Sequence, residues 1–135
     1  MTLSAQEALI HVMVIAATSD ARVSDRELEA IGTLVARLPV FDGFDRTHLG
    51  QVAAEALDLL KDSSDIDKVL DMVLGAVPER LRDTAYALAV EVTAVDLRLS
   101  QEELRLLEMV RDKLNLDGLI SAAIEASARA RLRHA

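Results

Sequence analysis

The sequence predicts an all-α fold of about seven helices, arranged as a pseudo-two-fold internal repeat around two buried central helices. Apolar residues recur at helical spacing in almost every window, and no stretch shows the sustained alternation of a strand. Aromatic residues are limited to one Tyr and two Phe, so aliphatic side chains must form the core. Nine residues, Asp20-Ala-Arg-Val-Ser-Asp-Arg-Glu-Leu28, return 76 positions later as Asp96-Leu-Arg-Leu-Ser-Gln-Glu-Glu-Leu104 with five identities.

The first predicted helix covers residues 4–18 and is apolar almost all round, which is typical of a helix that is buried all round. His11 is its only polar residue between positions 8 and 17, and we expect a hydrogen-bonded core histidine there. The second helix begins at Ser24. Its apolar face is predicted to consist of Leu28, Ile31, Val35 and Leu38.

Turn-forming residues separate the remaining helices. Pro39 and residues 40–45 form a loop, and Asp45 is predicted to cap a third helix that runs to about Leu60. A short fourth helix starts after Ser63 and ends near Gly75, and Pro78 occupies the first turn of a fifth. A sixth helix starts at Ser100, and a seventh follows the turn at 115–118 and ends in an arginine-rich segment.

The repeat defines the predicted organisation of the chain as one domain over residues 1–135. The offset of 76 aligns residues 8–38 with residues 84–114, so it matches the first helix with the fifth and the second with the sixth. The first and fifth helices are also the two most apolar. We therefore expect these two helices to lie side by side at the centre.

Composition excludes several functions. A net charge of −8 argues against a nucleic-acid partner, which normally meets a basic surface. The chain has no Cys, and its apolar runs are far shorter than the ~20 residues of a transmembrane helix. No catalytic motif or glycine-rich phosphate loop is present, so we expect a non-enzymatic, cytoplasmic protein.

Helix capping explains part of the repeated motif. Ser24 with Glu27, and Ser100 with Glu103, have the spacing of capping boxes, in which serine and glutamate each bond a backbone N–H of the other. The leucines that follow, Leu28 and Leu104, are then expected to be the first core residues of their helices.

The acidic residues of the repeat suggest a cation site. Asp20 and Asp96 follow the two apolar helices, at ends where the helix dipole disfavours a carboxylate. Glu91 lies in the apolar fifth helix, and a buried carboxylate needs a partner. For Asp20 and Asp96, the free N–H groups of the next helix, the nearby Arg22 or Arg98, or a cation would each serve as the partner, and Glu91 strengthens the cation option for the second copy. Hard cations such as calcium or magnesium prefer several oxygen ligands, although the spacing is not that of an EF-hand.

An apolar helix that ends in Asp, followed by a short turn and Ser-x-x-Glu-Leu, twice in one chain, resembles the tellurite-resistance TerB family. The resemblance covers essentially the whole chain, including the Val110-Arg-Asp-Lys-Leu-Asn-Leu-Asp117 segment. It implies a compact cytoplasmic helical protein with a stress-response role, in which acidic residues of the motifs bind a divalent cation. On this chain those residues are Asp20 and Glu27 in the first copy and Asp96 and Glu103 in the second.

The chain departs from the family pattern directly after each Asp. The family commonly has Gly there, whereas this chain has Ala21 and Leu97, which do not adopt positive φ cheaply. The chain therefore resembles a divergent member, with a different turn and with cation binding that is weakened or lost.

The sequence leaves three functions open. The first is a TerB-like domain with a cation site at Asp20, Glu27, Glu91, Asp96 and Glu103. The second is a helical adaptor that binds an unidentified protein, with the acids serving only as caps. The third is a hydrolase built on a carboxylate–metal site, which only the acidic residues support. The sequence does not define the oligomeric state.

Overall fold

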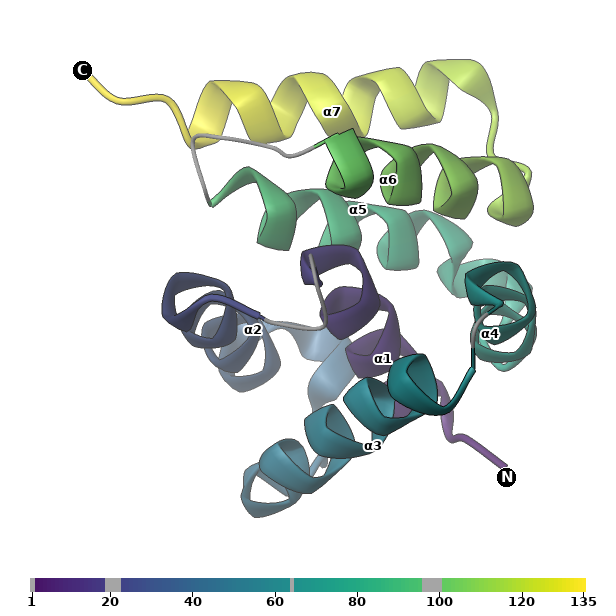
Figure 1. The fold of residues 1–135 in the computed structure, drawn as a ribbon. Coiled ribbons are helices and arrows are strands. Elements are labelled where there is room, and N and C mark those ends of the chain that lie inside the picture. The colour runs from purple at the N-terminus through teal and green to yellow at the C-terminus, as the bar shows by residue number, and fades with distance from the viewer. Residues whose placement is uncertain (1, 19–22, 64, 96–100) are drawn as a thin grey trace.

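The computed structural model describes residues 2–18, 23–63, 65–95 and 101–135. These ranges contain seven α-helices and no strand, which confirms the predicted all-α fold (Figure 1). The helices are α1 (Ala5–Ala17), α2 (Asp25–Arg37), α3 (Leu49–Asp62), α4 (Ile66–Gly75), α5 (Arg82–Ala94), α6 (Gln101–Leu114) and α7 (Gly118–Arg131). None of them is both long enough and apolar enough to cross a bilayer.

Helix α1 is the centre of the molecule. It begins with a complete capping box, in which the backbone N–H of Glu7 donates to Ser4 Oγ and the backbone N–H of Ser4 donates to Glu7 Oε1. Every residue from Ala8 to Ala17 is buried. The helix packs most extensively against α5, whose residues Ala85, Leu88, Ala89 and Val92 are also buried. The prediction of two adjacent, central apolar helices is therefore confirmed.

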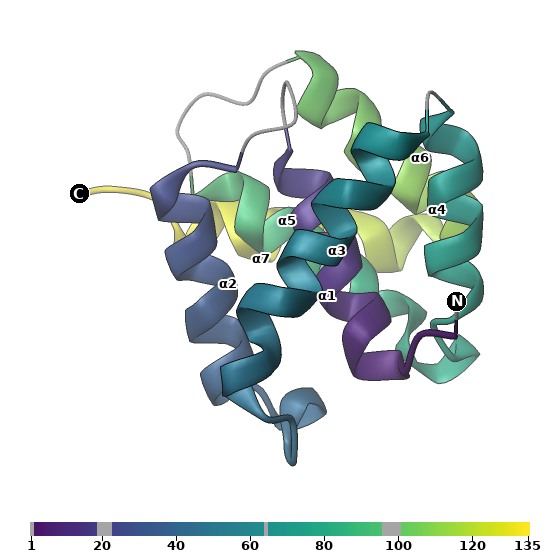
Figure 2. The same cartoon turned by 60° about the horizontal axis from the view of Figure 1, so that its bottom comes forward.

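The remaining helices surround this pair with a two-fold pattern of contacts. Helix α1 contacts α2 and α3, and α5 contacts α6 and α7 in the same order. Helix α1 also contacts α6, and α5 contacts α2, so each half packs across the centre onto the other (Figure 2). The relation therefore reaches beyond the sequence repeat and includes the third helix of each half, α3 and α7.

Two helix starts differ from the prediction by a short 3₁₀ turn. Asp45 accepts hydrogen bonds from the backbone N–H and the hydroxyl of Thr47, and so caps a turn at Arg46–His48 rather than α3 itself. Pro78 precedes a similar turn at Glu79–Leu81, and α5 starts only at Arg82. Asp45 is thus a cap, but of the 3₁₀ turn and not of α3, and the prediction that Pro78 lies in the first turn of α5 is wrong, because Pro78 precedes the 3₁₀ turn that leads into the helix.

Helix α4 packs against α1, α3 and α6. Its apolar face consists of Val69, Leu70, Val73 and Leu74, all buried. Beside this face, the Nζ atom of Lys113 in α6 lies 2.8 Å from Asp67 Oδ1 and 2.6 Å from Asp71 Oδ1. These two aspartates hold the pKa of Lys113 above its ordinary value. An apolar contact and an ion-pair cluster at its edge thus hold α4 on the bundle.

Candidate functional site

The glutamates of the two Ser-x-x-Glu-Leu motifs are buried in the first turns of α2 and α6. Glu27 is only 3% exposed and Glu103 only 6%. Glu27 also completes a capping box: its backbone N–H donates to Ser24 Oγ at 3.1 Å, and the backbone N–H of Ser24 donates to Glu27 Oε1 at 3.1 Å. The predicted cap of α2 is therefore confirmed.

The leucines of the same motifs are on the surface, which corrects the prediction that they begin the core. Leu28 is 45% exposed and Leu104 is 40% exposed. In α2 the buried stripe is Glu27, Ile31 and Val35, at spacings of four, and it excludes Leu28. In α6 the stripe likewise starts at Glu103 and continues through Leu107. Both copies of the motif thus turn the carboxylate inward and the leucine outward.

Asp20 and Asp96 lie outside the described residues, as does Ser100, the predicted cap of α6. The assignment of the two aspartates to a cation site therefore stays a prediction. Ala21 and Leu97 also belong to these segments.

Glu91 is partnered by an arginine. Arg131 of α7 donates from Nη1 to Glu91 Oε1 at 2.8 Å and from Nη2 to Glu91 Oε2 at 2.6 Å, and this contact raises the pKa of the guanidinium. A bidentate pair of this kind engages both carboxylate oxygens. Arg131 is thus the partner of the Glu91 carboxylate, and the pair connects the end of α7 to α5. A role for Glu91 as a cation ligand stays a prediction.

In the part of the chain that the structure describes, no three His, Asp or Glu side chains gather closely enough to hold a metal ion. Glu27 and Glu103 are the two predicted ligands in this part that Arg131 does not engage. They would form a cation site only together with the acidic segments before α2 and α6.

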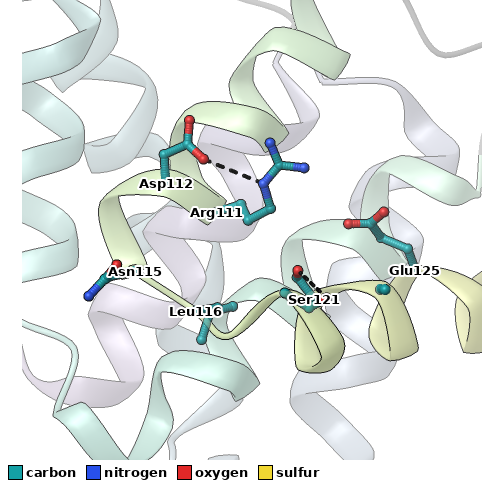
Figure 3. Close-up of a pocket in the computed structure, with 8 residues that line it drawn as sticks. Arg111, Asp112, Asn115, Leu116, Ser121 and Glu125 are labelled. Carbon is teal, nitrogen blue, oxygen red and sulfur yellow. Dashed lines mark hydrogen bonds and ion pairs between the residues drawn. The ribbon is translucent and has the colours of Figure 1, made fainter.

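A second polar region, not singled out in the sequence, lies between α6 and α7 (Figure 3). A cavity of about 450 Å³ is lined by Arg111 and Asp112 from one side and by Ser121 and Glu125 from the other. The buried hydroxyl of Tyr86 donates to Glu125 Oε2 at 2.7 Å. Burial of the phenol is the main reason that the pKa of Tyr86 is raised, and the hydrogen bond to the Glu125 carboxylate is the second. Two features of the sequence could have pointed to this region: Tyr86 is the only tyrosine, and Glu125 is the only acidic residue of α7.

His11 is a core residue, as predicted. Its side chain is fully buried, and Nδ1 lies 2.9 Å from the carbonyl oxygen of Glu7. Nε2 has no hydrogen-bond partner among the described residues. Among those residues, His11 belongs to no group of three His, Asp or Glu side chains that could hold a metal ion.

No protein-family model matches the chain, and neither does any curated protein or solved structure with which it was compared. The resemblance to the tellurite-resistance TerB family therefore rests on the motif residues alone.

Proposed function

We propose that the chain is a non-enzymatic, cytoplasmic stress-response domain of the tellurite-resistance TerB type, which binds a divalent cation through its two acidic turns. The observation that carries the proposal is the inward position of Glu27 and Glu103, each next to an exposed leucine. The same inversion in both copies of a repeat indicates a shared demand for a buried carboxylate at this place.

Capping alone does not require that burial. The capping box of α1 uses the same geometry, yet its glutamate, Glu7, is only partly buried and bonds Ser4 near solvent. Burial of a carboxylate costs free energy unless it is compensated. A cation shared with Asp20 and Asp96 would add to the contacts that Glu27 and Glu103 already make, and would favour calcium or magnesium, since all the ligands are oxygens.

Calorimetric titration with calcium and magnesium tests the proposal. We expect binding by the wild-type chain and a rise in its unfolding temperature at millimolar ion, because ligand that binds only the folded state stabilises it. Glu27→Gln, Glu103→Gln, Asp20→Asn and Asp96→Asn should each weaken binding. Glu55→Gln, an equal charge change in α3, should leave it unchanged. Absence of heat and of thermal shift in the wild type would refute the cation site.

A second candidate is an adaptor that binds a protein and uses the acids only as caps. The complete capping box at Ser24 and the exposed Leu28 and Leu104 favour it. Under this function, Ser24→Ala lowers the free energy of unfolding by about 0.5–2 kcal/mol. Glu27→Gln has a smaller effect, because glutamine can still accept from the Ser24 N–H, and neither loss depends on calcium. A loss that appears only when calcium is present would count against the adaptor and for the cation site.

A further inference from the structure

Helix α4 has no counterpart among the described helices. The two-fold pattern pairs α1 with α5, α2 with α6 and α3 with α7. Helix α4 packs against α1, α3 and α6. Under the same pairing, α1 corresponds to α5, α3 to α7 and α6 to α2. A helix related to α4 would therefore lie between α2, α5 and α7.

A groove occupies that place. It encloses about 470 Å³ and is lined by side chains from the three expected helices, among them Leu34 of α2 and Leu38 directly after it, Ala87 of α5, and Ala123 and Ile124 of α7. An adjoining hollow of about 280 Å³ shares Leu34 and Glu91 with it and continues along α2. In Figure 1, α4 lies on the right of the bundle and α2 on the left, on the opposite side of the central pair.

The exposure of the groove residues matches a missing helix. Leu34 and Leu38 are only partly buried. Their counterparts at the offset of 76 are Val110 and Leu114 of α6, the helix that carries α4, and both are buried. The apolar stripe of α2 therefore continues onto an open surface, whereas the equivalent stripe of α6 is buried.

Charge supports the same relation. Lys113, which binds Asp67 and Asp71 of α4, corresponds at the offset of 76 to Arg37 of α2. Arg37 is exposed and forms no ion pair with any described residue. Arg37 does not line the groove itself, but it directly precedes the lining residue Leu38. An exposed cation therefore stands next to the groove in sequence, at the position where its counterpart in α6 binds two aspartates four residues apart on one helix.

We propose that the groove between α2, α5 and α7 binds an amphipathic helix of a partner protein. The partner helix has aliphatic side chains on one face and, beside them, an acidic pair four residues apart that contacts Arg37. This is helix-in-groove recognition, with anchors at helical spacing. The small side chains of Ala87 and Ala123 let a helix approach closely. The inference does not need a bound cation: among the described residues, Glu91 is the one predicted cation ligand that lines the groove, and there it pairs with Arg131.

A fluorescein-labelled synthetic peptide with the sequence of residues 63–77, which contains α4, serves as the probe. Titrated with the full chain, it should show saturable binding by fluorescence anisotropy. Arg37→Glu should weaken binding about five- to tenfold, the effect of roughly 1 kcal/mol in a partly exposed ion pair. The matched control is Arg46→Glu, the same charge change in the loop before α3, and it should bind like the wild type.

A charge-swapped peptide, with lysine in place of Asp67 and Asp71, separates recognition from damage to the fold. It should bind the Arg37→Glu chain more tightly than it binds the wild type. No binding of the native peptide at millimolar chain overturns the proposal. Binding that responds to Lys113→Glu but not to Arg37→Glu also overturns it, because the peptide then replaces α4 itself. Self-association of the chain that Arg37→Glu abolishes would assign the groove to a second copy instead.

Discussion

At the residue scale, the bond between Tyr86 and Glu125 links protonation to stability. The raised pKa of Tyr86 means that the folded state favours the protonated phenol. Stability from this bond is therefore fully present below the unfolded tyrosine pKa of about 10. It is lost as the pH rises from there through the higher pKa of the folded state.

Tyr86 is the only tyrosine, and the chain has no Trp, so absorbance near 295 nm reports this one phenol. We expect the native chain to show little tyrosinate at pH 10.5, whereas the urea-unfolded chain should be largely ionised there. Tyr86→Phe should cost about 1.5–3 kcal/mol at pH 7, as for hydrogen bonds to charged groups. Its stability should also decline less above pH 10. A native titration near pH 10 would contradict the buried bond.

Single residues also show where sequence reasoning succeeded and failed. The Ser24 cap and the core position of His11 were predictable because each follows from local spacing. The inward turn of Glu27 was not, because a hydrophobic pattern assigns the carboxylate to solvent and the neighbouring Leu28 to the core. Only the tertiary packing of α2 reveals which of two adjacent residues lies on the buried stripe.

At the scale of elements, α4 is attached from one side of its axis only. Its buried face contacts α1, α3 and α6, while Met72 on its outer side is exposed. The lysine cluster with Asp67 and Asp71 lies at the edge of that contact. Exposed ion pairs contribute little individually, but two acids that share one lysine form a small network.

Lys113→Met should loosen α4 without unfolding the bundle. We expect amide hydrogen exchange in Ile66–Gly75 to become a few-fold faster, with smaller changes in α1. High salt should reduce the difference from wild type, since it screens exposed charges. Lys68→Met, a change within α4 at a lysine that pairs with no described residue, is the control. Equal exchange in both variants would show that the cluster does not hold α4.

The elements show a further limit of the sequence. The repeat over residues 8–38 and 84–114 was visible because α1, α2, α5 and α6 keep one constant offset. The relation between α3 and α7 was not, because the connection before α3 contains two 3₁₀ turns while that before α7 is short. A change in loop length shifts the register and removes the signal, although the contacts with α1 and α5 persist. The groove beside α7 was hidden for the same reason.

At the scale of the whole molecule, α1 connects the two halves. It contacts α2, α3, α4, α5 and α6, and its buried residues belong to a core shared by both halves. We therefore predict that the two halves unfold together as one unit.

Ile15→Ala in α1 tests this coupling. The side chain is fully buried, so the variant should lose about 2–5 kcal/mol of unfolding free energy. Circular dichroism at 222 nm and the absorbance of Tyr86 should still report one coincident urea transition. Met72→Ala, at an exposed position on α4, should change stability by no more than about 0.5 kcal/mol. Two separate transitions in Ile15→Ala would show that the halves fold independently.

The enclosure of α1 also has a consequence for synthesis. This helix leaves the ribosome before all the others, yet its main partner, α5, begins only at Arg82. Chains elongate at roughly 5–20 residues per second, so the interval is several seconds. Throughout it, α2, α3 and α4 can already pack on α1, but the side of α1 that faces α5 has no partner. The apolar segment from Ala8 to Ala17 is therefore fully covered only after the second half of the sequence has been made.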